Sequence, residues 1–306
     1  MTDRATSAPQ QGLRAVRAAV TITAATIVLA ACAAATSSPS ADQEHESSVK
    51  AETGAAVASS SLPAGAGRVQ VLAVARHGEV LAATDRGLFT VSRTGSSRVG
   101  TLTADLDGLA VSADEIYVSS HPAPGGQGPQ RASLLRSRDE GKTWTEVAAS
   151  DPAHLDALAV RGDTIVGWDR GRLWVSTDGG QAWRSTVTAT EPVSLTLDRT
   201  ALWLTGRNGL ERARQDGSAL VHVTDAPALV RGGLGADRAV WGMDQVGDVW
   251  LRDSHEQWRQ AASLASGSTV TAFTAIDARH AVVATGHQLV WITVNDVAAL
   301  PRITYT

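Results

Sequence analysis

Two eight-residue segments of this chain follow one pattern, Ser-x-Asp-x-Gly-x-x-Trp, and they begin at Ser137 and at Ser176. An aspartate in a tight turn can accept hydrogen bonds from backbone N–H groups, and a glycine allows the positive φ that many turns require. A pattern that returns after 39 residues (176 minus 137) predicts a repeated unit of supersecondary structure. The residues of the pattern are Ser137, Asp139, Gly141 and Trp144, and then Ser176, Asp178, Gly180 and Trp183.

Weaker copies of the pattern extend the repeat along the chain. In each copy a turn residue precedes an apolar residue by five positions, and the copies follow one another at intervals of 37 to 45 residues. Short apolar runs separated by Gly, Asp and Ser clusters lie between them, and no helical period persists, so the units are built from strands. The weaker copies are Thr94 to Val99, Asp216 to Val221, Asp253 to Trp258 and Asn295 to Leu300.

The repeated pattern resembles the Asp-box, or BNR repeat, of sialidases and related β-propellers. In that family the box is the hairpin between the third and fourth strands of a blade, and its tryptophan packs between blades. The resemblance implies an all-β fold: a single β-propeller of about six four-stranded blades over residues 67–306.

The N-terminus resembles the signal of a bacterial lipoprotein. A polar segment with three arginines precedes an uncharged run from Ala18 to Ala31, and the run ends in Leu29-Ala30-Ala31-Cys32, which is similar to a lipobox. We therefore expect residues 1–31 to be a signal peptide and Cys32, the only cysteine, to carry the lipid. The expected location is the extracytoplasmic face of the cell membrane. An uncleaved spanning segment and a plain secreted protein remain as alternatives.

Residues 32–66 differ in composition from the rest of the chain. They consist mainly of Ala, Ser, Gly and Thr, whereas all nine tryptophans lie beyond residue 66. Such a segment buries too little apolar surface to offset the entropy of ordering it. We therefore expect a disordered tether over residues 32–66.

A closer resemblance rests on the second unit. Ser120-His121-Pro122 opens a loop rich in Gly and Pro, and a strong copy of the box follows it. This arrangement is similar to that of actinobacterial-type lipoproteins labelled glycosyl hydrolase or exo-sialidase by similarity. Members of that group generally begin the first blade with a His-rich strand, whereas this chain has Arg68-Val69-Gln70-Val71.

Sialidase chemistry is not expected from these residues. Sialidases use a tyrosine nucleophile paired with a glutamate and normally carry an Arg-Ile-Pro motif, which this sequence lacks. Its two tyrosines are Tyr117, inside a predicted strand, and Tyr305, next to the C-terminus. Hydrolysis of other glycosides requires only two suitably spaced carboxylates, so a glycosyl hydrolase other than a sialidase remains an alternative.

Candidate ligand residues lie in the loops that join one blade to the next and in those between second and third strands. Functional residues concentrate on loops held by a rigid scaffold. Among many polar loop residues, which include Asp169, we expect five to line one pocket near the mouth of the central channel: Asp105, Asp107, His121, His154 and Asp156. In the alternative interpretation His121 bonds its own loop and the aspartates cap strand ends.

Several other motifs are absent, which excludes some kinds of site and partner. No H-x-H, H-E-x-x-H or calcium-loop spacing is present, so the sequence predicts no metal site, and nothing in it indicates a cofactor. A net charge of −4 without a basic stripe argues against nucleic acid as a partner. Three functions remain: binding of a protein or glycan, glycoside hydrolysis by a rim carboxylate pair, and assembly or stabilisation of a membrane complex.

Overall fold

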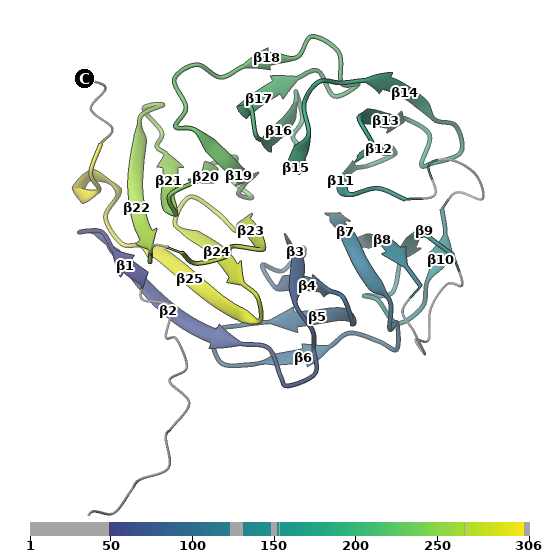
Figure 1. Cartoon of the computed structure of the whole chain (residues 1–306), viewed down its shortest axis with the longest axis horizontal. Helices are drawn as coiled ribbons and strands as arrows, with labels where there is room; N and C mark the ends of the chain where they lie inside the picture. Colours follow the sequence, from purple (N-terminus) through teal and green to yellow (C-terminus); the bar gives the residue numbers. More distant parts are fainter. Residues whose placement is uncertain (1–48, 123–130, 148–151, 153, 266, 303–306) are drawn as a thin grey trace, which may run out of the picture. The chain divides into compact units, whose positions relative to one another are not determined.

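Six antiparallel sheets surround a central channel in the computed structural model, which describes residues 49–122, 131–147, 152, 154–265 and 267–302 (Figure 1). Each sheet is one blade, and its first strand lies nearest the channel. The predicted all-β propeller of six four-stranded blades is therefore confirmed. Among the described residues the only helix is the 3-10 turn η1, Val297–Ala299, and none is long and apolar enough to cross a membrane.

The first three blades follow one another in the sequence, and each takes its four strands in chain order. Blade one contains β3 (Val69–Val74), β4 (Val80–Thr84), β5 (Gly87–Val91) and β6 (Ser96–Arg98). Blade two contains β7 (Asp105–Ser112), β8 (Glu115–His121), β9 (Ser133–Ser137) and β10 (Thr145–Glu146). Blade three contains β11 (Ala157–Arg161), β12 (Thr164–Asp169), β13 (Arg172–Ser176) and β14 (Arg184–Val187).

The last three blades continue the same order, except at their outer edges. Blade four contains β15 (Pro192–Leu197), β16 (Leu202–Gly206), β17 (Gly209–Ala213) and β18 (Val221–His222). Blade five contains β19 (Leu229–Leu234), β20 (Val240–Asp244), β21 (Asp248–Arg252) and β22 (Trp258–Leu264). Blade six contains β23 (Ala272–Ala275), β24 (His280–Thr285) and β25 (Gln288–Val294).

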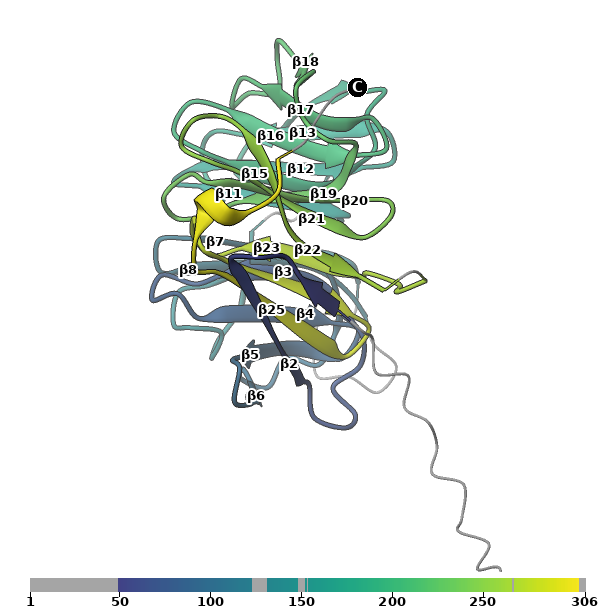
Figure 2. The ribbon, with the colours of Figure 1, turned by 90° about the vertical axis from the view of Figure 1, so that its left-hand side faces the viewer.

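The N-terminal part of the folded unit closes the ring. Strand β2 (Ala55–Ser61) pairs with β25 along all seven of its residues and forms the fourth strand of blade six (Figure 1, Figure 2). Strand β1 (Val49–Ala51) pairs with β22 and adds a fifth strand to blade five. The first and last parts of the folded chain thus share one sheet, which joins the two ends of the propeller.

This closure corrects the predicted tether over residues 32–66 and the predicted domain start at 67. Residues 49–51 and 55–61 are strands of the folded unit, because an edge strand is held by backbone hydrogen bonds, which residues with small side chains also make. Val49 and Val57 add apolar contacts with the core between blades five and six. The fourth-strand copy predicted from Asn295 to Leu300 is also wrong, since η1 occupies that segment. The predicted signal peptide, Cys32 and residues 33–48 lie outside the described residues.

The core lies mainly between neighbouring blades. All five residues of β4 are buried, and apolar side chains of blades one and two form one continuous cluster around Leu88, Leu106 and Val118. Complete burial of one such side chain contributes about 1.5–3 kcal/mol. Because every blade packs on two neighbours, the loops at both ends of the channel are held on a stiff ring.

Hairpins at 137–144 and 176–183 repeat one hydrogen-bond arrangement in blades two and three. In the first, the Ser137 hydroxyl donates to Asp139 Oδ1 and accepts the Gly141 N–H, each at 2.8 Å. Asp139 also accepts the Thr143 N–H at 2.8 Å, and Trp144 Nε1 donates to the Gly141 carbonyl at 3.1 Å.

The second hairpin reproduces these bonds 39 residues later. Asp178 Oδ1 accepts the Ala182 N–H at 2.9 Å, and Ser176 Oγ accepts the Gly180 N–H at 2.8 Å. Gly180 has a φ of 93°, and a Cβ at this position would clash with Val147 of the preceding blade. The hairpin therefore requires glycine both for its turn and for its close approach to blade two.

Candidate functional site

The direction of the strands defines two ends of the channel. The first strands β7 and β11 begin at one end, and the second strand of blade two, β8, returns to it, so that His121 pairs with Asp105. We call this end the channel mouth. The channel has a volume of about 210 Å³ and is lined by first strands of all six blades, with Asp107 and Asp156 at the mouth. The hairpins at 137–144 and 176–183 follow third strands that run away from the mouth, so they lie at the opposite end.

A β-bulge aims Asp107 out of its sheet. The register of β7 shifts between Leu106 and Gly108, which leaves Asp107 outside the ladder. Bulges redirect side chains in this way and are common next to functional sites. The first strand of blade one has the same irregularity at Gln70, whose side-chain amide donates to the Asp105 carboxylate.

The position equivalent to Asp107 on the neighbouring blade is Asp156. It directly precedes β11, and its backbone N–H donates to the Trp168 carbonyl at 2.8 Å. Two residues earlier lies His154. The intervening Leu155 is fully buried, and its N–H donates to Ser119 Oγ at 2.9 Å, which fixes the residues just before β11 against β8.

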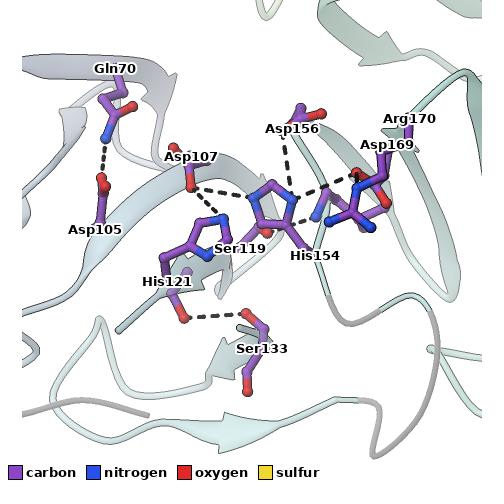
Figure 3. A network of polar contacts seen from close by, with 12 residues as sticks. Gln70, Asp105, Asp107, Ser119, His121, Ser133, His154, Asp156, Asp169 and Arg170 are labelled. Carbon is purple, nitrogen blue, oxygen red and sulfur yellow. Dashed lines mark hydrogen bonds and ion pairs between the residues drawn. The ribbon is translucent and has the colours of Figure 1, made fainter. Parts of the chain in front are cut away.

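Two histidines meet across this connection (Figure 3). The ring centroids of His121 and His154 are 4.1 Å apart. Asp107 Oδ2 lies 3.3 Å from His154 Nε2 and 3.5 Å from His121 Nε2, so one carboxylate faces both rings. The other ring nitrogen of His154, Nδ1, lies 3.6 Å from Asp156 Oδ1 and 3.8 Å from Asp169 Oδ1. We call Asp107, His121, His154, Asp156 and Asp169 the His–Asp cluster.

The electrostatics of the cluster follow from burial and from this crowding of carboxylates. Burial raises the pKa of Asp156, and the charges of Asp169 and Asp107 raise it further. Burial also raises the pKa of Asp105, with the charge of Asp107 as the next cause. The hydrogen bond to Asp107 raises the pKa of His154 against the opposing effect of burial. The cluster therefore favours a bound positive charge.

The structure brings together four of the five predicted ligand residues, and the fifth lies beside them. Asp107, His121, His154 and Asp156 belong to the His–Asp cluster, whereas Asp105 pairs with Gln70 next to it. Neither Asp169 nor Gln70 was among the five. Asp169 was one loop residue among many, and the bulge that directs Gln70 depends on strand register, which no local pattern in the sequence reports.

The sequence also offered no metal-binding spacing, yet the cluster contains metal-ligating groups. Two groups of three residues each bring one ligand atom per residue within 4.8 Å of the others. The groups are Asp107, His121 and His154, and His154, Asp156 and Asp169. Motifs such as H-x-H detect ligands on one element. Here the donors come from β7, the end of β8, the connection before β11 and the end of β12.

Tyr117 lies away from the channel mouth. Its side chain is buried in β8, and its hydroxyl donates to Glu115 Oε2 at 2.5 Å. Burial, followed by this hydrogen bond, raises the pKa of Tyr117 to about 12. Tyr117 lies near the start of β8, at the end of the channel opposite the mouth, and it is a core residue. This agrees with the prediction that Tyr117 lies inside a strand. Tyr305 lies outside the described residues.

Comparison with known proteins identifies the fold class of this protein but no family. No protein-family model matches the sequence, and no curated protein matches it. Among solved structures, a streptogramin B lyase is 14% identical, with a TM-score of 0.55, over 80% of this chain and 100% of that one. A nidogen/laminin complex gives 16% identity and a TM-score of 0.53 over 67% and 84% of the two chains. YCF48 bound to D1 peptide gives 10% identity and a TM-score of 0.52 over 78% and 97%. At these identities the shared property is the β-propeller fold, which has six blades in this chain.

Proposed function

We propose that this protein is a lipid-anchored, extracytoplasmic β-propeller that binds a protein partner at the channel mouth, with a glycan as the alternative ligand. The observation that carries the proposal is the His–Asp cluster: five ionisable side chains from two neighbouring blades converge at one end of the channel. Ionisable groups that face one another, rather than backbone donors, form a surface suited to recognition.

The exposure of the cluster supports docking. The side chains of His121 and Asp156 are 44% and 45% exposed, and the adjacent Arg170 is 86% exposed. These groups sit on loops fixed by the stiff ring of blades, which limits the entropy lost on binding. Two fold neighbours, in the nidogen/laminin complex and in YCF48 with D1 peptide, show that propellers of this shape accept protein partners. This support is analogy of fold alone.

The surface favours a protein over a glycan. Sugar rings commonly stack on exposed aromatic faces, but in the part of the chain that the structure describes the exposed large apolar side chains are all aliphatic. They are Val187, Val193, Leu220, Val221 and Val246. A charged and polar mouth of this kind suits a peptide segment that carries basic groups.

The anchor in this proposal is Cys32, lipidated after removal of residues 1–31. Because β1 begins at Val49, the connection consists of residues 33–48, which is 16 residues rather than the 34 of residues 33–66. A flexible chain of that length spans about 20–25 Å. The partner is therefore expected at the membrane surface, in the layer next to the lipid headgroups.

The hairpins at 137–144 and 176–183 belong to this proposal as Asp-boxes of the BNR type. Their support is the repeated bonding of Asp139 and Asp178 to backbone N–H groups within the same turn. As Asp-boxes they would stabilise blades two and three and take no part in binding. In this proposal the chain shares the propeller scaffold of the sialidase-like lipoprotein group but has no sialidase activity.

A second function is favoured by one specific feature. Asp107 and Asp156 face opposite ring nitrogens of His154, and burial raises the pKa of Asp156, as in the acid of many glycosidases. The alternative is therefore a glycosyl hydrolase in which Asp156 is the acid and Asp107 the second carboxylate. Asp156→Asn should then abolish hydrolysis of a glycoside panel.

Crosslinking and affinity capture from native membranes test the proposed function. A tagged full-length chain with His154→Ala should recover its partner at least about 10-fold less well than the wild type. The control is His280→Ala, because His280 also pairs with an aspartate, Asp277 at 2.8 Å, but lies at the opposite end of the propeller. Equal recovery by all three chains would overturn the site. Capture of several subunits of one membrane complex would identify the protein as an assembly or stability factor, and capture of a glycan alone would select the alternative ligand.

Cys32→Ala tests the anchor separately. This chain should appear in the soluble fraction or as an unprocessed precursor, whereas the wild type should incorporate a fatty-acid analogue. A wild type that takes up no label would contradict lipidation.

A further inference from the structure

The donor atoms of three cluster residues have the spacing of a metal site. Asp107 Oδ2 lies 3.3 Å from His154 Nε2 and 3.5 Å from His121 Nε2, and the three residues each offer a ligand atom within 4.8 Å of the other two. A tetrahedral Zn²⁺ with bonds of about 2.0–2.1 Å separates neighbouring ligand atoms by roughly 3.3 Å. Two of the three separations are thus close to the edge length of such a tetrahedron.

The surroundings of His154 add an independent feature of zinc sites. A metal-bound histidine almost always donates its other ring N–H to a carboxylate or carbonyl, which fixes the tautomer and the orientation of the ring. His154 Nδ1 faces Asp156 Oδ1 and Asp169 Oδ1, at 3.6 and 3.8 Å. Without an ion, Nε2 forms a hydrogen bond with Asp107. With an ion bound, Nε2 would coordinate it and the ring proton would lie on Nδ1, which faces these two carboxylates.

The site is also held in place before any ion binds. The His154 side chain is only 12% exposed, and its backbone is fixed by the bond from the Leu155 N–H to Ser119. The bulge at Asp107 and the end of β8 position the other two ligands. A first shell supported by packing and by outer hydrogen bonds retains its geometry without the metal.

The ligand set selects the class of ion. Two imidazoles and one carboxylate suit Zn²⁺ and similar divalent transition metals, whereas Ca²⁺ and Mg²⁺ prefer shells of oxygen atoms. Three protein ligands leave a fourth coordination position open, as in catalytic zinc sites.

We propose that Asp107, His121 and His154 bind a divalent transition-metal ion, Zn²⁺ foremost, with Asp156 and Asp169 as the carboxylates that orient His154. The open position faces the channel mouth, where a water molecule or a donor group of a partner can occupy it. The site goes beyond the proposed function and does not depend on it, because the ion binds to the isolated chain.

Titration of the metal-free chain tests the site without any partner. The full-length chain is purified without a polyhistidine tag and with Cys32→Ser, which removes the lone thiol as a competing ligand. We expect one Zn²⁺ per chain by calorimetry, and a Co²⁺ derivative with the intense visible bands of tetrahedral coordination. Ca²⁺ and Mg²⁺ should bind far more weakly.

Variants separate ligands from their supports. His154→Ala or Asp107→Ala should weaken Zn²⁺ binding by at least about 100-fold, and Asp156→Asn by about 10-fold, the size typical of outer-shell partners. His121→Ala is the second ligand variant, because His121 is the most exposed of the three and its loss should leave the fold intact. His280→Ala should bind like the parent chain.

Three results would overturn the site: no stoichiometric binding, equal affinity in the His154→Ala chain, or a Co²⁺ spectrum of octahedral coordination. In the first case His154 would instead be a protonated bridge between Asp107 and Asp156. Partner capture repeated with a chelator separates the two proposals. Recovery unchanged by chelation, from a chain that binds Zn²⁺, supports both as independent properties, and loss of recovery shows that the partner needs the ion.

Discussion

Blades two and three carry aspartates at both ends of the channel, and the partners of these aspartates differ. At the hairpin end, Asp139 and Asp178 accept N–H groups no more than four residues away. At the mouth, Asp107 faces His154, which is 47 residues away on another blade. A carboxylate that completes its own turn has a structural task, whereas one that meets only other ionisable side chains is free to exchange those contacts for a ligand.

Among the variants considered, Gly180→Ala should lower the stability most, because it disrupts the hairpin at 176–183. The substitution combines a positive φ with a clash against Val147, and we expect a loss of about 2–4 kcal/mol in the free energy of unfolding, measured with urea. Gly179→Ala is the control, since Gly179 has a φ of 72° but its Cβ would meet only Asp163, at an ordinary contact distance of 3.9 Å. Equal losses in the two variants would show that contact between the blades adds nothing.

A smaller effect is expected from Ser176→Ala. It removes the acceptor of the Gly180 N–H, and an unpaired buried N–H costs about 1–3 kcal/mol. His121→Ala at the mouth should change the free energy of unfolding by no more than about 0.5 kcal/mol, because its side chain is 44% exposed and lies outside the core between the blades. Thermal unfolding of both variants under one condition measures the difference. A reversed order would mean that the mouth is the structural end.

The acid dependence of stability should also report the hairpin end. Hydrogen bonds from the Thr143 hydroxyl, the Thr143 N–H and Ser137 lower the pKa of Asp139 from 3.8 to about 2. A lowered carboxyl pKa gives stability that is present above the unfolded value and is lost as the pH falls through the folded value. Asp139→Asn should therefore flatten the decline in melting temperature between those two values. A decline as steep as that of the wild type would contradict the assignment.

Sequence reasoning reached the local features of this molecule and missed those made by distant pairing. The hairpins at 137–144 and 176–183 were predictable because all their bonds lie within eight residues, and the repeat then gave the blades. Strand β2 was missed because its Ala and Ser side chains carry no signal, and its stability comes from backbone bonds to β25 at the other end of the chain.

The site falls between these two cases. His121 and His154 could be placed at one face from the order of strands and loops, and the structure does bring them together. Their shared contact with Asp107 depends on a bulge in β7, and the contribution of Asp169 depends on where β12 ends. Register and strand length are settled by packing of the whole ring, so no local motif predicts them.

Site-specific photo-crosslinking compares the two ends most directly. A photo-reactive amino acid is placed either at Arg170, exposed beside the His–Asp cluster, or at Lys142, exposed in the hairpin at the opposite end. After irradiation of native membranes, we expect a discrete protein adduct from position 170 and none from position 142. An adduct from position 142 alone, or equal adducts from both, would contradict a partner site at the channel mouth.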